Sequence, residues 1–232
     1  MNLQQLKDEW ANVPEFHKAI HESFCDFVNA DEKLKRHRDW VETNMWGFGE
    51  RSFWWLWKII CDELPEHADV LEVGVFRAAT LSVIGMLRSD ISLTGVTPLN
   101  TAGDVWESDY RADIDKIFDL FNKVRPTIIQ GYSQEERVIE MARLLSPYDV
   151  VYLDGDHSFD GTLADFNNYA PMVKVGGYLV VDDCNNDLNF PPQGFFTGIQ
   201  TVTDAKLKWL ETQTDFEFTA SCVHISIFRR IK

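Results

Sequence analysis

Residues 149–157 read DVVYLDGDH and residues 176–184 read GGYLVVDDC, and each stretch is an apolar run that ends on acidic side chains. Continuous runs of valine, leucine and tyrosine are typical of strands that are buried on both faces of a parallel sheet. We expect strands at residues 149–154 and 177–182, so that the first ends at Asp154 and the second at Asp182, which Asp183 follows. The two stretches therefore predict neighbouring parallel strands whose carboxyl ends bring carboxylates together.

The rest of the chain alternates in the same way. Three earlier strands are expected at residues 69–74, 91–97 and 126–130. Five helices are expected at residues 78–87, 109–123, 134–145, 158–172 and 197–212. A closing hairpin is expected at residues 215–220 and 223–229. This order predicts an α/β fold, a Rossmann-like seven-stranded and mostly parallel sheet with helices on both faces and a C-terminal antiparallel hairpin. Residues 1–43 are predicted to be an N-terminal helical extension, and residues 44–232 the main domain.

Composition narrows the class of protein. The chain has 232 residues, 45% of them hydrophobic, and a formal net charge of −15. A surface this acidic repels phosphate backbones and anionic lipid, which disfavours nucleic-acid and membrane partners. The four cysteines are scattered, and the first residues, MNLQQLKDEW, do not resemble a signal peptide. We therefore expect a cytoplasmic protein with reduced thiols and no zinc cluster.

The acidic strand ends predict a catalytic or metal site. Asp154, Asp182 and Asp183 would repel one another unless a proton or a cation neutralised them. Carboxylate oxygens in a loose array suit Mg²⁺. His157 follows Asp154 by three residues and could serve as a general base near neutral pH. The structural alternatives are that Asp156 only caps the next helix and that the two later aspartates only begin a loop.

The first strand ends in a glycine turn. Residues 71–80 read LEVGVFRAAT, so that Gly74 could let the backbone approach a ligand before the next helix begins. The alternative is an ordinary strand-to-helix turn. A single glycine is not the Gly-x-Gly-x-x-Gly fingerprint, which argues against a nucleotide-dependent dehydrogenase.

Together these motifs resemble the class I S-adenosylmethionine-dependent methyltransferases. The segment DGDHSF is most similar to the metal-dependent O-methyltransferases of the macrocin type. The catechol O-methyltransferases have the same kind of metal site. The resemblance covers residues 44–230. It implies S-adenosylmethionine and Mg²⁺ as cofactors, Asp154, Asp182 and Asp183 as metal ligands, and His157 as the catalytic base. The cofactor-binding residues that it implies are Trp46, Gly47, Glu72, Gly74, Phe76, Thr80, Thr97, Gly131, Tyr132, Ser133 and Asp154, with Gln134 beside them.

The chain departs from the family pattern at the second strand. The acidic residue that accepts hydrogen bonds from the ribose hydroxyls would fall on Thr97, which carries no charge. Asp104, in the following loop, is an alternative that the sequence cannot place. Ala78 stands where many family members have glycine. The departure at Thr97 leaves open a non-catalytic small-molecule-binding protein on the same fold.

Other features give weaker indications. Loops 98–108 and 184–195 leave the active-site edge and are candidate substrate lids. The tryptophans near the proposed cofactor segment are interpreted as core with an interface rather than a stacking platform, which is compatible with a homo-oligomer. These are Trp46, Trp54, Trp55 and Trp57. The remaining histidines are interpreted as surface or packing residues: His17, His21, His37, His67 and His224. The expected partner is a small hydroxylated acceptor, sugar-like or catechol-like.

Overall fold

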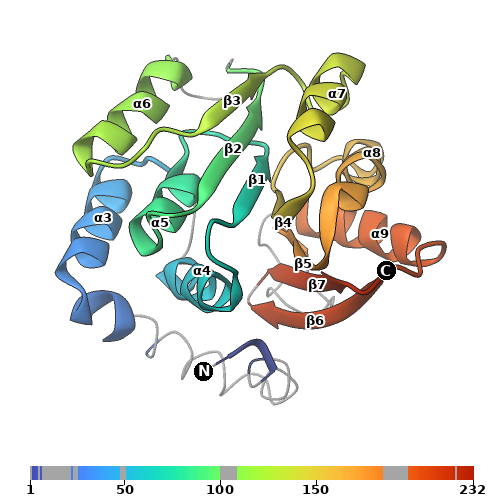
Figure 1. The fold of residues 1–232 in the computed structure, drawn as a ribbon, viewed down its shortest axis with the longest axis horizontal. Coiled ribbons are helices and arrows are strands. Elements are labelled where there is room, and N and C mark those ends of the chain that lie inside the picture. Colours follow the sequence, from blue (N-terminus) through green and yellow to red (C-terminus); the bar gives the residue numbers. More distant parts are fainter. Residues whose placement is uncertain are drawn as a thin grey trace.

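The computed structural model describes residues 2–4, 6, 22, 26–47, 51–99, 109–184, 198–222 and 224–232. A seven-stranded sheet forms the centre of the molecule, in the order β3-β2-β1-β4-β5-β7-β6 (Figure 1). Strands β1 to β5 are parallel, whereas β7 runs antiparallel to both β5 and β6. The predicted fold class is therefore confirmed.

The elements follow the predicted alternation. Before and within the parallel part of the sheet they are α3 (Glu32–Thr43), α4 (Arg51–Glu63), β1 (Asp69–Val73), α5 (Ala79–Leu87), β2 (Ser92–Thr97), α6 (Tyr110–Leu120), β3 (Thr127–Gln130), α7 (Glu136–Leu145) and β4 (Tyr148–Leu153). The remainder are α8 (Phe159–Tyr169), a 3₁₀ turn (Ala170–Met172), β5 (Val173–Val181), α9 (Gly198–Leu210), β6 (Phe216–Cys222) and β7 (Ile225–Arg230).

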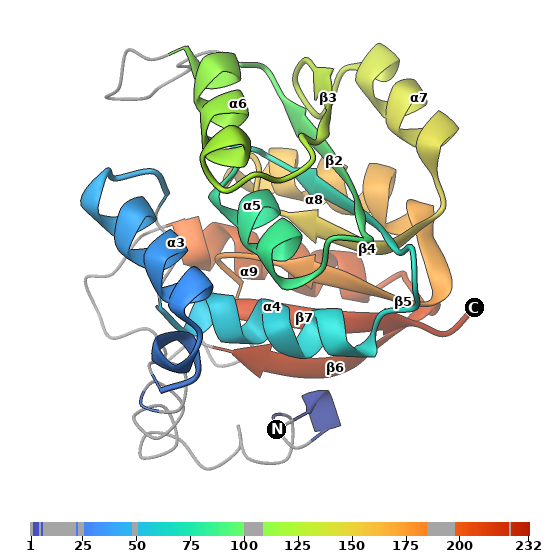
Figure 2. The ribbon, with the colours of Figure 1, turned by 60° about the vertical axis from the view of Figure 1, so that its left-hand side comes forward.

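Helices cover both faces of the sheet and bury a separate apolar core on each (Figure 2). Side chains alternate along β4, so that Val150 and Tyr152 join the core beneath α3 to α6. Val151 and Leu153 join the core beneath α7, α8 and α9. A strand that is apolar at every position is the consequence of this double burial.

Strand β5 begins earlier than the sequence predicted. The helix expected to extend to residue 172 ends at Tyr169, and β5 begins at Val173 rather than at Gly177. Val173 is fully buried and pairs with Tyr148 before the register shifts. Two adjacent glycines had marked the strand start, but tertiary burial of Val173 extends the strand past them.

Helix α4 confirms that the tryptophan cluster belongs to the core. Trp54 is 1% exposed and Trp57 0%, and Trp57 meets the ring of Tyr152 edge-on at 5.2 Å. Helix α3 packs on the same core, where Nε2 of its His37 lies 2.7 Å from the Ser82 hydroxyl.

Among the described residues, no helix combines the length and the apolar character that crossing a membrane requires. The boundary predicted between residues 43 and 44 stays a prediction.

Candidate active site

The acidic residues after β4 and β5 lie side by side. Leu153 pairs with Val181 at the ends of the two strands. The amide of Asp154 donates to the Val73 carbonyl at 2.8 Å, and the amide of Asp182 donates to the Leu153 carbonyl at 2.9 Å. Because the ladder continues through both aspartates, their backbones are held in the sheet. The structure thus brings together the side chains that the two sequence motifs predicted at one edge.

His157 completes this group from the turn that precedes α8. Its Nε2 lies 3.3 Å from Oδ2 of Asp183 and 3.7 Å from Oδ1 of Asp154. The turn is shaped by Asp156, whose Oδ1 accepts from the Ser158 amide at 2.8 Å. Ser158, rather than Asp156, is the N-cap of α8. The alternative interpretation of Asp156 as the helix cap is therefore wrong, and Asp156 instead stabilises the turn that carries His157.

Sequence reasoning missed Tyr152. Its hydroxyl donates to Oδ2 of Asp182 and lies 3.4 Å from Oδ2 of Asp154. Tyr152 therefore contacts the aspartates at the ends of both strands. The side chain is fully buried against Trp57. The available signal was the two-residue period of a strand, which places Tyr152 on the same face as Asp154.

Sequence reasoning also missed His224, which was interpreted as a surface or packing residue. That interpretation is wrong, because its Nε2 lies 3.2 Å from Oδ1 of Asp182 and 3.7 Å from Oδ1 of Asp183. His224 stands directly before β7, and β7 is antiparallel to β5. The start of β7 therefore lies at the carboxyl end of β5. The order of the strands was the signal that could have found this residue.

The electrostatics of the group follow from crowded carboxylates at low exposure. Burial, then repulsion by Asp182, raises the pKa of Asp154 to about 7. Burial and the same neighbour raise the pKa of Asp183. Burial also acts to raise the pKa of Asp182, but hydrogen bonds from His224 and Tyr152 outweigh it and lower that pKa. Burial opposes protonation of His157, yet its bond to Asp154 raises its pKa. The group holds excess negative charge that a proton or a cation can neutralise.

The donor atoms at this edge fit a divalent cation. Two sets of three side chains place one ligand atom each within 4.8 Å of the others. One set is Asp154, His157 and Asp183, and the other is Asp182, Asp183 and His224. Carboxylate oxygens and imidazole nitrogens together are donors that divalent metals accept. Each set contains a histidine, and Asp183 belongs to both.

The glycine turn after β1 has a structural reason that the sequence did not reveal. Gly74 has a φ of +100°, and a Cβ there would lie 2.5 Å from the Cα of Gly155 and closer still to the carbonyl group of Asp154. Gly74 therefore makes room for the turn that carries Asp154. The close approach predicted for a ligand is made by the protein's own backbone.

Glu72 is the unsatisfied acid of the site. It is 3% exposed, and its Oε2 has no hydrogen-bond partner among the described residues. Burial and the charge of Asp154 raise its pKa well above the usual range, although the Thr80 hydroxyl hydrogen-bonds to it. A buried carboxylate oxygen without a partner fits a ligand that donates N–H groups, such as an ammonium.

Gly47, which the resemblance assigns to the cofactor site, lies against the start of α5. A Cβ on Gly47 would lie 2.8 Å from that of Ala79. Trp46 is 4% exposed, and the Arg77 guanidinium stacks on its ring at 4.0 Å. Phe76 meets Tyr110 edge-on at 5.0 Å. Trp46 is thus a packed residue beside the glycine turn, and residues 48–49 lie outside the described residues.

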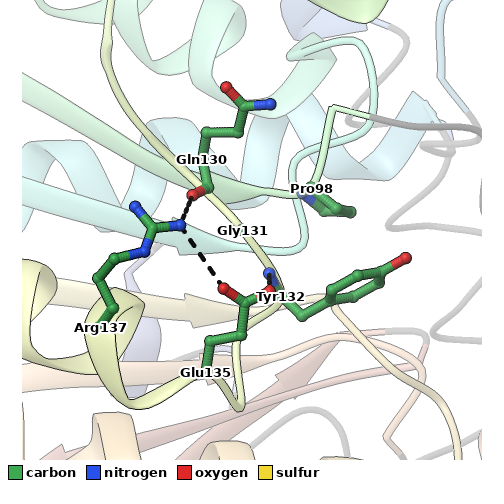
Figure 3. Close-up of a pocket in the computed structure, with 6 residues that line it drawn as sticks. All are labelled: Pro98, Gln130, Gly131, Tyr132, Glu135 and Arg137. Carbon is green, nitrogen blue, oxygen red and sulfur yellow. Dashed lines mark hydrogen bonds and ion pairs between the residues drawn. The ribbon is translucent and has the colours of Figure 1, made fainter.

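The opposite end of the candidate cofactor site lies at the carboxyl ends of β2 and β3. Thr97 is 2% exposed, and its hydroxyl accepts from the Leu99 amide at 3.2 Å. A pocket opens beside it (Figure 3), lined by Pro98, Gln130, Gly131, Tyr132, Glu135 and Arg137. The Ser133 carbonyl accepts from the Tyr169 hydroxyl at 2.7 Å. Asp104 and most of both candidate lid loops lie outside the described residues.

An ion pair forms one wall of this pocket. Arg137 donates to the Gln130 carbonyl at 2.9 Å, and its guanidinium lies 3.5 Å from the Glu135 carboxylate (Figure 3). Glu135 in turn accepts from the Tyr132 amide at 3.1 Å. Gln134 reaches the other way and donates to Asp165 on α8 at 3.3 Å. The predicted residues 131–134 therefore connect the pocket to the buried interior.

Comparisons with known proteins agree with this architecture. Residues 71–184 match the family model described as a methyltransferase domain. An uncharacterized protein of Acanthamoeba polyphaga mimivirus is 31% identical over 124 residues, which are 53% of this chain and 54% of that protein. The chain thus spans about half the length of the curated relative that it matches.

Solved structures share the fold. One is a proposed caffeoyl-CoA O-methyltransferase from Staphylococcus aureus, at 16% identity and a TM-score of 0.66 over 90% of this chain and 98% of that one. Another is the TDP-rhamnose 3′-O-methyltransferase of calicheamicin biosynthesis, at 12% identity and a TM-score of 0.56 over 93% and 94% of the two chains. The resemblance of residues 71–184 to a methyltransferase is confirmed by the family match, and its fold by these structures.

Proposed function

We propose that the methyltransferase domain at residues 71–184 transfers a methyl group from S-adenosylmethionine to an oxygen of a small acceptor with adjacent hydroxyls. The observation that carries the proposal is the convergence of Asp154, His157, Asp182 and Asp183 at the carboxyl edge of β4 and β5. Ligands of open α/β sheets bind at that edge. A net charge of −15 favours a small acceptor over a polyanionic one.

The cofactor would lie along the glycine turn. S-adenosylmethionine supplies a methyl group on a positively charged sulfonium. Glu72 is placed to accept from the ammonium of its methionine part, because its Oε2 is buried and unpartnered among the described residues. We assign Gly131, Tyr132 and Ser133, beside the pocket of Figure 3, to the adenine end. Thr97 would meet the ribose as a neutral partner, whose hydroxyl oxygen already accepts from Leu99.

A divalent cation would be held by Asp154, Asp182 and Asp183. When bound, it supplies Lewis-acid chemistry that lowers the pKa of an acceptor hydroxyl. Burial and mutual repulsion raise the pKa values of Asp154 and Asp183, so a bound cation would stabilise their ionised forms. Tyr152 keeps one oxygen of Asp182 fixed. Adjacent hydroxyls on the acceptor would match two neighbouring coordination positions.

His157 is the general base of the proposal. Its side chain is 34% exposed, while Nε2, the atom that faces the carboxylates, is buried. It would take the proton of the acceptor hydroxyl, and the charge it gains is stabilised by Asp154 and Asp183 at 3.7 and 3.3 Å. The backbone of His157 is fixed because its carbonyl accepts from the Thr201 hydroxyl on α9 at 2.5 Å. Positioning of the acceptor oxygen against the methyl group supplies the remaining rate enhancement.

Calorimetric titration with S-adenosylmethionine, with and without Mg²⁺, tests the cofactor. We expect binding in the micromolar range. No heat at millimolar cofactor would overturn the proposal. Methyl transfer to a panel of sugars and catechols should fall about 10²- to 10⁴-fold in His157→Asn, the range for loss of a general base. His67→Asn, on the exposed surface, is the matched control and should keep full activity.

A second candidate is a non-catalytic binding protein on the same fold. Thr97 favours it, because the charged ribose partner is replaced by a buried hydroxyl. This candidate predicts that ligands bind but that no acceptor in the panel is methylated. It also predicts that His157→Ala leaves the biological role of the protein unchanged.

A further inference from the structure

The position of His224 is fixed by contacts with the segment that carries the two aspartates. Val181 pairs with Ser226, so that His224 lies beyond this pair at the carboxyl end of β5. The Cys184 amide donates to the His224 carbonyl at 2.5 Å, and the Ser226 hydroxyl donates to the Cys184 carbonyl at 2.9 Å. Two hydrogen bonds thus hold the start of β7 to residues 182–184. The approach of the imidazole to the carboxylates is built into the sheet.

The spacing of the donor atoms is close to that of a metal coordination sphere, with one distance within the range and one slightly above it. Nε2 of His224 lies 3.2 Å from Oδ1 of Asp182 and 3.7 Å from Oδ1 of Asp183. Ligand atoms at about 2.1 Å from one ion, the usual metal–nitrogen and metal–oxygen distance, are about 3.0 Å apart at right angles and about 3.4 Å apart in a tetrahedron. We propose that His224 is an imidazole ligand of the cation, and that it gives this centre its preference for a first-row transition ion over Mg²⁺.

Burial and orientation support a ligand rather than a surface ion pair. The side chains of Asp182, Asp183 and His224 are only 13%, 17% and 17% exposed. Tyr152 occupies Oδ2 of Asp182, which leaves Oδ1 directed at His224. Asp183 has a φ of +46°, in the left-handed region that aspartate tolerates better than most residues. This backbone turn allows both consecutive carboxylates to face the same histidine.

Glu72, whose Oε2 the proposed function assigns to the cofactor ammonium, adds a fourth acidic side chain near the aspartates. It is 3% exposed, its Oε2 has no hydrogen-bond partner among the described residues, and the charges of Asp154 and Asp182 both act on it. Four acidic side chains therefore share one buried edge. A bound cation is the arrangement that stabilises such a cluster when its members are ionised.

The imidazole ligand determines which cation the site prefers. Mg²⁺ prefers oxygen ligands and retains water, whereas Zn²⁺, Fe²⁺, Ni²⁺ and Cu²⁺ suit imidazole nitrogen. His157 lies on the far side of Asp183, whose Oδ2 faces it while Oδ1 faces His224. The two histidines therefore have separate roles, one as ligand and one as base. The inference rests on the proposed function for the location of the cation.

Measurements of metal affinity test the ligand role of His224 separately from the proposed methyl transfer. The full chain would be titrated with NiCl₂ and with MgCl₂ by calorimetry, in wild type, His224→Gln and His67→Asn. His224→Gln keeps a side chain of similar reach with an oxygen donor, and asparagine tolerates the φ of +56° at residue 67. We expect a loss of Ni²⁺ affinity of at least about tenfold in His224→Gln, a change in Mg²⁺ affinity below about threefold, and no change in the control.

A spectroscopic measurement keeps the inference independent of activity. Pulsed electron paramagnetic resonance of the Cu²⁺-loaded wild type should show coupling to a directly bound ¹⁴N nucleus, and His224→Gln should lack it while His157→Gln retains it. Equal Ni²⁺ to Mg²⁺ affinity ratios in wild type and His224→Gln, or nitrogen coupling that survives His224→Gln, would overturn the inference. Normal metal ligation with no methyl transfer would overturn the proposed function alone.

Discussion

Replacing Gly74 by alanine tests whether the cofactor turn and the catalytic edge are one packed unit. The glycine has a φ of +100°, where an L-residue costs about 1–2 kcal/mol. The new Cβ would also lie 2.5 Å from the Cα of Gly155 and closer to the Asp154 carbonyl, whereas ordinary contact begins at 3.4 Å. Because backbone rather than a flexible side chain must yield, the overlap adds about 1–3 kcal/mol. We expect the free energy of unfolding to fall by about 2–5 kcal/mol.

Gly176→Ala is the matched control. It has a φ of +88°, but a Cβ there would meet nothing within 4 Å, so only the conformational cost of about 1–2 kcal/mol applies. Urea denaturation of the two variants beside wild type gives both values. The overlap would shift Asp154 by about 1 Å, a displacement that can reduce methyl transfer about 10²-fold in Gly74→Ala while Gly176→Ala stays active. Equal destabilisation of the two variants would refute the steric argument.

Three further predictions concern buried groups. Ala78, the residue before α5, has a φ of +60°, so Ala78→Gly should raise the free energy of unfolding by up to about 1 kcal/mol in urea denaturation, and a decrease would contradict the strain. Glu72→Gln removes a carboxyl whose pKa is raised by burial, so it should stabilise the protein at pH 8. The same substitution should weaken the affinity for S-adenosylmethionine about 10- to 100-fold by calorimetry. Unchanged affinity would remove Glu72 from the cofactor site. Burial raises the pKa of Asp165 to about 7, so the folded state retains a proton that the unfolded state has lost, and stability falls as pH rises from about 4 to about 7. Asp165→Asn should flatten this dependence by on the order of 3 kcal/mol, as measured by denaturation at pH 5 and pH 8, and an unchanged pH slope would exclude Asp165 as its source.

The ribose end shows how a departure from the family pattern is accommodated. Thr97 ends β2 with its side chain buried, and its hydroxyl satisfies the amide of Leu99, whose φ is +55°. A charged acid at this place would have to leave that local bond to reach a ligand. The threonine therefore stabilises the first turn of the loop after β2, and under the proposed function we expect affinity for the cofactor to depend more on Glu72 and on residues 131–133.

The sequence alone determined the alternation of strands and helices and the meeting of Asp154 with Asp182 and Asp183. Both follow from local patterns, because apolar runs predict doubly buried strands and consecutive parallel strands end at one edge. Only the tertiary structure decided that β7 enters between β5 and β6, which brings His224 to the aspartates, and that Gly74 makes room for Asp154. These contacts join residues far apart in the chain, and their geometry depends on how the strands pair, which no local pattern encodes.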